Sequence, residues 1–463
     1  MFMFYAAAAM TLGIFIAAGT IIGAKSTSSS KDYSLGGRKS SAAGVTGILL
    51  GALVGGASTV GTVQMSYTYG LTACWFTLGA GAACLMLGLR FAAPLRNAQI
   101  TTVADYLAKS YGGESFCGRA IAFTATVSAS LGTFISVCAQ FLSCIAMLRG
   151  IFPLSAAGAA IAASVSILGF IASGGLKSYS KLGEAKIVLL FFALIACFAA
   201  SVSKGGTLTA VTSALPLHPW MNPFSQGVTT ELGYFAAMVA GVFTAQIYIQ
   251  SFLAAKDADT AKKGAFASAL LMPPMGLLGI WIGLSVRASG AVMEPSKVLP
   301  WFIMDSFPPF WAGIVWGGIL ITVIGCAAGL VLGVATNIVT NLVPARVIAK
   351  YGKNSASLER ALVFLIVAAA ALAGVFGSNA MILDWSYLSM GLRGAGTLLP
   401  FVFAVMRPGF VSPKCALASS VGGLAAMLVW AFAGLGGEPL FAGLAASAIC
   451  IIIGALGGKE RAN

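Results

Sequence analysis

The chain has 463 residues, and 59% of them are hydrophobic before its 57 glycines are counted. Soluble domains are about 45–50% apolar with glycine included and about 25% charged, whereas only 9% of this chain is charged. This composition excludes a soluble enzyme, a disordered protein, a coiled coil and a disulfide scaffold. It predicts an all-α polytopic membrane protein.

Apolar runs of 17 or more residues predict about thirteen membrane-spanning helices. Their approximate limits are 2–24, 42–70, 71–93, 117–148, 154–173, 184–203, 229–254, 264–286, 311–343, 361–377, 380–406, 414–435 and 439–457. The first run lacks a basic start and a cleavage site, so we expect a retained helix rather than a signal peptide.

The net charge of +14 is spread over short segments between the apolar runs, which favours membrane topology over a nucleic-acid partner as its explanation. Alternate segments hold most of the cations, at 25–39, 90–119, 177–186, 256–263, 346–360, 407–414 and 459–461. The segments between them hold only Arg149, Lys204, Arg287 and Lys297. The positive-inside rule therefore places the N-terminus outside and the C-terminus inside, which requires an odd number of spans.

Two of the predicted helices contain interruptions. Glycines crowd the stretch from Gly51 to Gly61, and Gln246, Tyr248 and Gln250 place polar groups at membrane depth in the seventh run. Glycine weakens a helix interior, and unwound backbone in a membrane is tolerated only where it lines a cavity. Interrupted segments at corresponding places in two halves indicate an inverted repeat with the binding site between them. Tight helix packing is the alternative explanation of the glycines.

Several short motifs occur in one order along the chain. They are Lys31–Lys39, Gly56–Gly61 followed by Tyr69 and Gly70, Thr102–Leu107, Gln250–Asp257, and Leu299–Pro309 followed by Gly313. In sequence and spacing they resemble the sodium:solute symporter family from about residue 31 to 435. The resemblance implies a leucine-transporter-like fold and cation-coupled solute uptake. We then expect one transporter domain, divided into an extra helix and loop (1–41), a first repeat of five helices (42–228), a second repeat (229–406) and two C-terminal helices (407–463).

The sodium site that the resemblance implies departs from the family pattern. Its backbone carbonyls would come from Ala57, Val60 and Thr322, and its two hydroxyl positions fall on Gly325 and Cys326. Na⁺ is a hard cation that requires oxygen ligands. Glycine offers no side-chain oxygen and a thiol is a poor substitute, so a Na⁺ site is uncertain here.

A second departure lies at the start of the sixth helix. Where the family often carries an aspartate, this chain has Gly183 next to Glu184, and Lys186 lies about one turn deeper. We hypothesise that the Lys186 ammonium occupies the place of Na⁺, which would make transport proton-coupled or uncoupled. The alternative is that Lys186 is interfacial and extends its ammonium to the cytoplasm.

Polar residues of three predicted helices are candidates for the solute pocket. They are Ser58, Thr59 and Gln64 in the second run, Gln140 in the fourth, and Gln246 and Tyr248 in the seventh. Each could instead make hydrogen bonds between helices. Arg393 lies near the middle of the run 380–406, where a charge costs at least about 2.5–3.5 kcal/mol.

The guanidinium of Arg393 could hold a solute carboxylate, or it could form a structural pair with Asp384. Asp384 lies nine residues earlier, about 13 Å away along an ideal helix, which is too far for a direct pair on one straight helix.

The resemblance and these residues favour a secondary transporter of a small polar organic solute in the cell membrane, working by alternating access. We expect no catalytic site, no organic cofactor and no zinc or disulfide framework, since the nine cysteines and the single His218 form no ligand pattern. Na⁺ or H⁺ is the expected coupling ion, and uncoupled transport is an alternative. Na⁺-coupled symport through a non-standard site, a solute-sensing protein and a channel are the alternatives, and the sequence leaves the oligomeric state open.

Overall fold

The computed structural model describes residues 1–24, 38–98, 100, 102–343 and 355–459. Within them, regular structure is helical apart from one parallel bridge between Ser40 and Ala255, which confirms the predicted all-α class. The α-helices are α1 (Phe2–Ala24), α3 (Ala42–Leu53), α4 (Thr62–Tyr69), α5 (Cys74–Met86), α6 (Ala92–Asn97), α7 (Val103–Ser110), α8 (Phe116–Arg149), α9 (Ala156–Ser203), α10 (Leu208–Ala214), α11 (Leu217–Trp220), α12 (Val228–Thr244), α13 (Gln246–Ala254), α14 (Ala258–Ala288), α15 (Val298–Ser306), α16 (Pro309–Asn341), α18 (Ser355–Phe376), α19 (Ile382–Ala395), α20 (Leu398–Met406), α21 (Pro413–Phe432) and α22 (Pro439–Lys459).

Seven helices of the described chain are long and apolar enough to cross a membrane, or nine if each of two bent pairs counts as one span. Four shorter apolar helices accompany them: Phe2–Ala18, Ala42–Leu53, Ala156–Ala172 and Pro439–Gly454. The chain is therefore a multi-pass membrane protein. Thirteen spans, and their direction across the bilayer, remain predictions.

One of the seven, the continuous run Ala57–Asn97, turns back at Gly70, whose φ of 74° favours glycine. Before the turn, Thr62 faces Gly279 and Ser66 faces Gly283, so α4 runs parallel to α14. After it, contacts pair Thr77 with Gly276 and Gly88 with Ala265, so this part of the chain runs antiparallel. The predicted division at residue 70 into two helices is confirmed.

Helix α9 also consists of two arms that are not collinear. A Cβ placed on Gly325 would lie 3.6 Å from the Phe170 ring and 3.7 Å from Cδ of Lys186. Sixteen residues of straight helix would separate these two residues by about 24 Å along its axis. The arms 156–172 and 185–203 therefore both pack against α16, and the second arm brings Lys186 into the centre of the protein.

Both predicted interruptions are present. Helix α3 ends at Leu53, Val54 is extended, and a π-helical turn (Ala57–Gly61) precedes α4. Helices α12 and α13 meet at Ala245, which is extended, and bend by 49°. A third break, not predicted from the sequence, bends α19 and α20 by 52°.

Helix starts follow ordinary capping chemistry. Ser115 and Ser155 accept hydrogen bonds from Gly118 and Gly158 at the starts of α8 and α9. Asp257 caps α14, and the hydrogen bonds from Thr260 lower the pKa of this exposed carboxyl.

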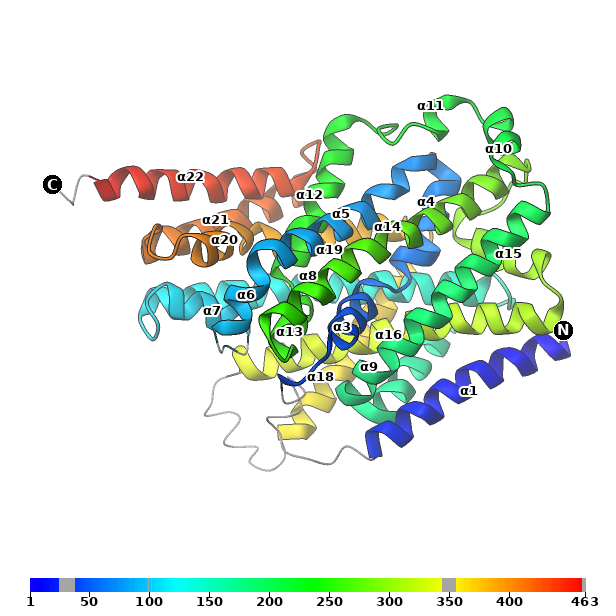
Figure 1. Cartoon of the computed structure of the whole chain (residues 1–463), viewed down its shortest axis with the longest axis horizontal. Coiled ribbons are helices and arrows are strands. Elements are labelled where there is room, and N and C mark those ends of the chain that lie inside the picture. The colour runs from blue at the N-terminus through cyan, green and yellow to red at the C-terminus, as the bar shows by residue number, and fades with distance from the viewer. Residues whose placement is uncertain (25–37, 99, 101, 344–354, 460–463) are drawn as a thin grey trace.

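Segments that the charge pattern places on one side lie at one end of the helical bundle. At the basic end, which carries residues 38–40, 90–98 and 255–263, Ser40 pairs with Ala255, and Arg96 donates to the carbonyls of Ala255 and Lys256. At the opposite end, which carries 67–75, 204–227 and 287–305, Tyr67 bonds to the Ala291 carbonyl. Figure 1 shows α1 beginning at one end and α22 ending at the other.

Candidate functional site

Lys186 occupies the junction between the broken helix and α16. Its side chain is 5% exposed, and Nζ donates a hydrogen bond of 2.8 Å to the carbonyl of Gly51, in the last turn of α3. Gly325 packs alongside, since a Cβ there would lie 4.0 Å from Nζ. The interpretation that Lys186 extends to the membrane surface is therefore wrong, because the ammonium is buried between three helices.

Cys326 lies against the same turn, and its thiol donates to the carbonyl of Ala52 at 3.5 Å. The carbonyls that Lys186 and Cys326 contact thus belong to the end of α3. The expected carbonyls lie beyond the break, where that of Ala57 accepts hydrogen bonds from the amide and the hydroxyl of Thr62. Helix α3 ends at Leu53, just before the break, and cation binding by the carbonyls of Ala57 and Val60 stays a prediction.

Of the other expected members of the cation site, Val60 and Thr322 are buried within their own helices, and the side chain of Glu184 is not among those that the structure describes. Val60 is buried in the π-helical turn. The Thr322 hydroxyl donates to the Gly318 carbonyl of its own helix at 2.8 Å. The side chain of Glu184 lies outside the described residues.

Close contacts explain why glycines stand at the break. A Cβ on Gly55 would lie 2.7 Å from the Gln140 amide oxygen and 2.8 Å from the Cys326 sulfur, and one on Gly56 would lie 2.1 Å from the Ser143 hydroxyl. The amide oxygen of Gln140 accepts the N–H of Gly56 at 2.7 Å. Gln140 therefore satisfies a backbone donor that the unwound helix leaves without a partner.

The hydroxyls of the break contact its own backbone. Ser58 accepts from the N–H of Gly55 at 3.1 Å, and Thr59 donates to the Gly55 carbonyl at 2.8 Å. Both side chains are fully buried. In this structure they shape the break, and solute contact by either remains a prediction.

Gln64 lies farther from the break, toward the opposite end of the protein. Its amide accepts from the N–H of Ile382 and donates to the carbonyl of Ala380, both at 3.1 Å. These bonds join α4 to the start of α19. Together with the bond of Tyr67 to Ala291, they close the opposite end above the broken helices.

Arg393 is 1% exposed in the middle of the bundle. Its Nη2 donates to the Ser136 hydroxyl at 2.6 Å, Tyr248 lies beside the guanidinium, and Nε has no partner. Within the described chain no carboxylate lies within ion-pair distance of Arg393, so a structural pair with Asp384 is not formed. Solute binding by Arg393 stays a prediction.

A cavity of about 220 Å³ extends from the second break toward the basic end. Its lining is uncharged and includes Ala245 at the break, with amides and hydroxyls from α8, α13 and α16: Thr133, Gln246, Gln250, Thr336, Asn337, Thr340 and Asn341. The amide oxygen of Gln246 accepts the N–H of Val103 at 2.9 Å. A cavity thus adjoins the second break on its basic side, while the bonds of Gln64 and Tyr67 join neighbouring segments on the other side.

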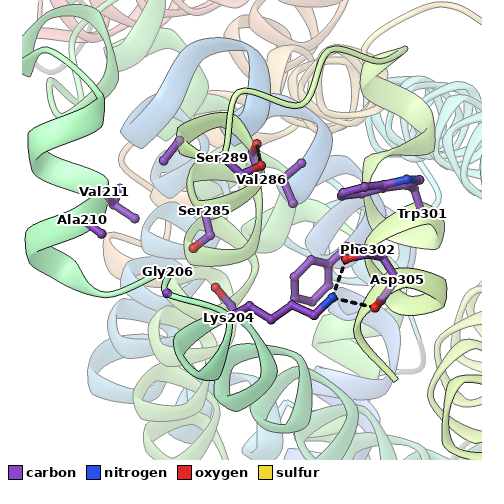
Figure 2. Close-up of a pocket in the computed structure, with 13 residues that line it drawn as sticks. Lys204, Gly206, Ala210, Val211, Ser285, Val286, Ser289, Trp301, Phe302 and Asp305 are labelled. Carbon is purple, nitrogen blue, oxygen red and sulfur yellow. Dashed lines mark hydrogen bonds and ion pairs between the residues drawn. The ribbon is translucent and has the colours of Figure 1, made fainter. Parts of the chain in front are cut away.

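A larger pocket of about 310 Å³ lies at the opposite end, between α9, α14 and α15. Figure 2 shows Lys204 reaching across it to the carboxylate and carbonyl of Asp305. This pocket touches neither break, and its two charges neutralise each other. We therefore place the functional site at the breaks rather than in the larger pocket.

Residues 33–423 match the sodium:solute symporter family. The chain belongs to this family. Its members are membrane transporters rather than enzymes, in agreement with the absence of a catalytic pattern from the sequence.

The high-affinity choline transporter 1 of Drosophila melanogaster is 24% identical over 62% of this chain and 48% of its own length. The uncharacterized symporter YwcA of Bacillus subtilis (strain 168) is 25% identical over 58% of this chain and 53% of its own. The chain thus spans about half the length of the curated relatives it matches.

Among solved structures, this symporter-family chain is similar to a Na⁺-coupled sialic acid symporter in a substrate-bound outward-open state. The TM-score is 0.78 with 15% identity, covering 98% of this chain and 97% of the other. A manganese transporter of Eremococcus coleocola gives 0.50 with 12% identity, covering 89% and 86%. These likenesses confirm the leucine-transporter-like fold.

Sequence reasoning missed the polar residues that α16 contributes to the cavity at the basic end. Asn337 and Asn341 are four residues apart near the end of α16, and Asn341 donates to Asn337 at 2.8 Å. Two amides on one face of an apolar run could have indicated this lining, since polar side chains within membrane helices face the protein interior or a cavity.

Proposed function

We propose that this member of the symporter family is a proton-coupled secondary transporter of a small, carboxylate-bearing polar solute, working by alternating access. The main support for the proposal is the hydrogen bond from the Lys186 ammonium to the Gly51 carbonyl. Through this bond, Lys186 places a positive charge of the protein itself at the junction between the broken helix and α16.

Two arguments oppose a Na⁺ ion at this junction. Gly325 supplies no oxygen and Cys326 supplies sulfur, whereas a hard cation requires oxygen ligands. In addition, a second unit charge about 4 Å from an ammonium is repelled by about 4 kcal/mol at an effective dielectric constant of 20. A lysine in a desolvated site can release its proton, so Lys186 can alternate between charged and neutral forms where a symporter would load and release Na⁺.

Arg393 supports the choice of a carboxylate solute. Its guanidinium is buried, has a donor without a partner, and has no carboxylate beside it in the described chain. A buried cation without a counter-charge is costly, and its planar fork fits a carboxylate in a bidentate manner. The structural neighbour is named for sialic acid and the fly relative for choline; Arg393 favours an acid over a cationic solute.

Alternating access is supported by the asymmetry of the structure. The cavity at the basic end reaches Ala245, while the bonds of Gln64 close the other end. The uncharged amide and hydroxyl lining offers hydrogen bonds to a polar solute without holding it tightly, as release requires.

A thermal-shift screen of purified protein against small organic acids tests the proposal. A ligand that binds only the folded state raises the unfolding temperature. We expect stabilisation by at least one acid, of equal size in Na⁺ and in N-methylglucamine buffers of the same ionic strength, and lost in Arg393→Gln. Stabilisation that requires Na⁺ would contradict the proposed role of Lys186.

Counterflow in proteoliposomes then separates the three classes of protein. A carrier exchanges labelled for unlabelled solute against its gradient, a channel does not, and a sensor moves no solute. We expect exchange.

A further inference from the structure

Two carboxylates face one cavity at the opposite end of the protein, far from Lys186 and Arg393. Asp384 lies in the first turn of α19, and Glu438 directly precedes α22. They line a cavity of about 180 Å³ together with Tyr234 of α12 and Tyr387 of α19. The two tyrosine rings stack with centroids 4.0 Å apart and planes 8° from parallel.

These carboxylates differ from the others at this end of the molecule. Glu294 pairs with Lys297 at 2.8 Å, and Asp305 pairs with Lys204. In the described chain, neither Asp384 nor Glu438 lies within ion-pair distance of a cation.

A third carboxylate adds to the negative charge. Glu231, on α12, is fully buried; one of its oxygens accepts from Thr72 at 2.8 Å and the other has no partner. The charges of Glu231, Asp384 and Glu438 all act on the Tyr234 hydroxyl. Three carboxyl groups thus lie around the stacked tyrosines, and none of them pairs with a cation in the described chain.

Tyr387 gives a second and independent indication. Its side chain is 3% exposed and lines the cavity, yet its hydroxyl has no hydrogen-bond partner. A buried phenol without a partner is unfavourable. A cation in this cavity would bind the lone pair of that hydroxyl oxygen.

The position of Glu438 is fixed by two glycines. Gly437 has a φ of 87°, which turns the chain just before α22. Gly233 leaves room for the stem of Glu438, because a Cβ there would lie 2.0 Å from Cγ of Glu438. The carboxylate is thereby held against α12 instead of extending into solvent.

We propose that this cavity is a binding site for a hard divalent cation of the Ca²⁺ type, held by Asp384, Glu438 and the hydroxyl of Tyr387. Carboxylate and other oxygen ligands are the donors that such ions prefer, and two positive charges neutralise both carboxylates. A bound ion would tie α19, which carries Arg393, to the start of α22, where Glu438 already packs against Gly233 of α12. The ion would therefore brace the closed end of the protein, and this inference does not depend on the proposed solute or coupling ion.

Protons compete for the same oxygens. Burial first, and the charge of Asp384 second, raise the pKa of Glu438 to about 7. The groups that face Glu438 are Asp384 on α19 and Tyr234 on α12, with Glu231 farther along α12. Cation binding is therefore expected to strengthen as the pH rises above 7.

Thermal unfolding of the purified chain in nanodiscs, at pH 8 and constant ionic strength, tests the site with Ca²⁺ as the probe. We expect a saturable rise in unfolding temperature, half-complete near about 10⁻⁴–10⁻³ M, the range of weak extracellular Ca²⁺ sites. The rise should vanish in Asp384→Asn/Glu438→Gln and persist in Glu294→Gln, a control in which a paired carboxylate of the same end is neutralised.

Tyr387→Phe gives a milder variant in case the double variant fails to fold. It should shift the half-saturating Ca²⁺ concentration upward several-fold while leaving both carboxylates in place. The proposal is overturned if wild type shows no saturable Ca²⁺ response, if Na⁺ at equal ionic strength gives the same rise, or if the carboxylate or Tyr387 variants respond as wild type does.

Discussion

The ammonium of Lys186 donates a hydrogen bond of 2.8 Å to the carbonyl of Gly51. One partner lies on the second arm of α9 and the other in the last turn of α3 before it unwinds. Gly325 and Cys326 of α16 face the same point, where the family resemblance places two hydroxyls. A fixed cation of the protein thus lies beside the two positions at which the resemblance implies hydroxyl ligands for Na⁺.

Restoring the missing ligands should restore a Na⁺ response. In Lys186→Ala/Gly325→Ser/Cys326→Ser, the ammonium is removed and two hydroxyls replace it. The side chain at 325 fits, because its Cβ would meet neighbours only at ordinary contact distances of 3.6 Å or more. We expect the unfolding temperature of the triple variant to rise with Na⁺ relative to N-methylglucamine, whereas that of wild type stays unchanged. A Na⁺-induced rise in wild type would refute this reading of the junction.

Removing the guanidinium should weaken binding of an acidic solute. Arg393→Gln deletes one partner of a buried charge pair, which costs about 2–5 kcal/mol, or about thirtyfold or more in affinity. Arg407→Gln is the matched control, because Arg407 lies over the ring of Phe410 outside the cavity. Isothermal titration with the acid from the screen measures both variants. Equal affinities would assign Arg393 a structural role only.

Close packing at the first break predicts a large difference between two glycine substitutions. Gly56→Ala places a Cβ 2.1 Å from the Ser143 hydroxyl, whereas Gly169→Ala in α9 meets nothing within 4 Å. We expect the first to destabilise the protein by about 1–3 kcal/mol. The second should be neutral or stabilising by up to about 1 kcal/mol, as alanine is a better helix former. Thermal unfolding of the two variants side by side decides the matter, and equal stability would show that the break is loosely packed.

The raised pKa of Glu438 predicts a pH-dependent stability. Its folded pKa of about 7 exceeds the value of 4.5 of an unperturbed carboxyl, so the folded state binds more protons between these values. The stabilisation that protonated Glu438 contributes is therefore fully present below pH 4.5 and is lost as the pH rises through 7. In buffer without divalent cations, the unfolding temperature of wild type should fall between pH 5 and pH 8 by more than that of Glu438→Gln. Parallel curves for the two proteins would be inconsistent with this shift.

Much of this arrangement could be predicted from the sequence, because buried charges and clustered glycines in apolar runs carry strong signals. Lys186, Arg393 and the breaks near residues 51–61 and 240–250 were identified in this way. The partners of Gln64 and Gln140 could not be, since an amide in a helix can face a cavity or a neighbouring helix with the same spacing. The carbonyls of Gly51 and Ala52, which Lys186 and Cys326 contact, could not be predicted either, because glycines permit unwinding without fixing the residue at which it starts. The break between α19 and α20 follows Gly394–Gly396, a short signal that resembles ordinary helix packing.

Solute-driven proton movement into proteoliposomes tests the central claim most directly. With a pH-sensitive dye inside, addition of the acid identified by the screen should acidify the lumen of wild-type vesicles equally with and without Na⁺, beyond the change in protein-free vesicles. In Lys186→Met the extra acidification should disappear while counterflow exchange continues. Acidification that is unaffected by Lys186→Met, or solute uptake that occurs only with a Na⁺ gradient, would contradict the account.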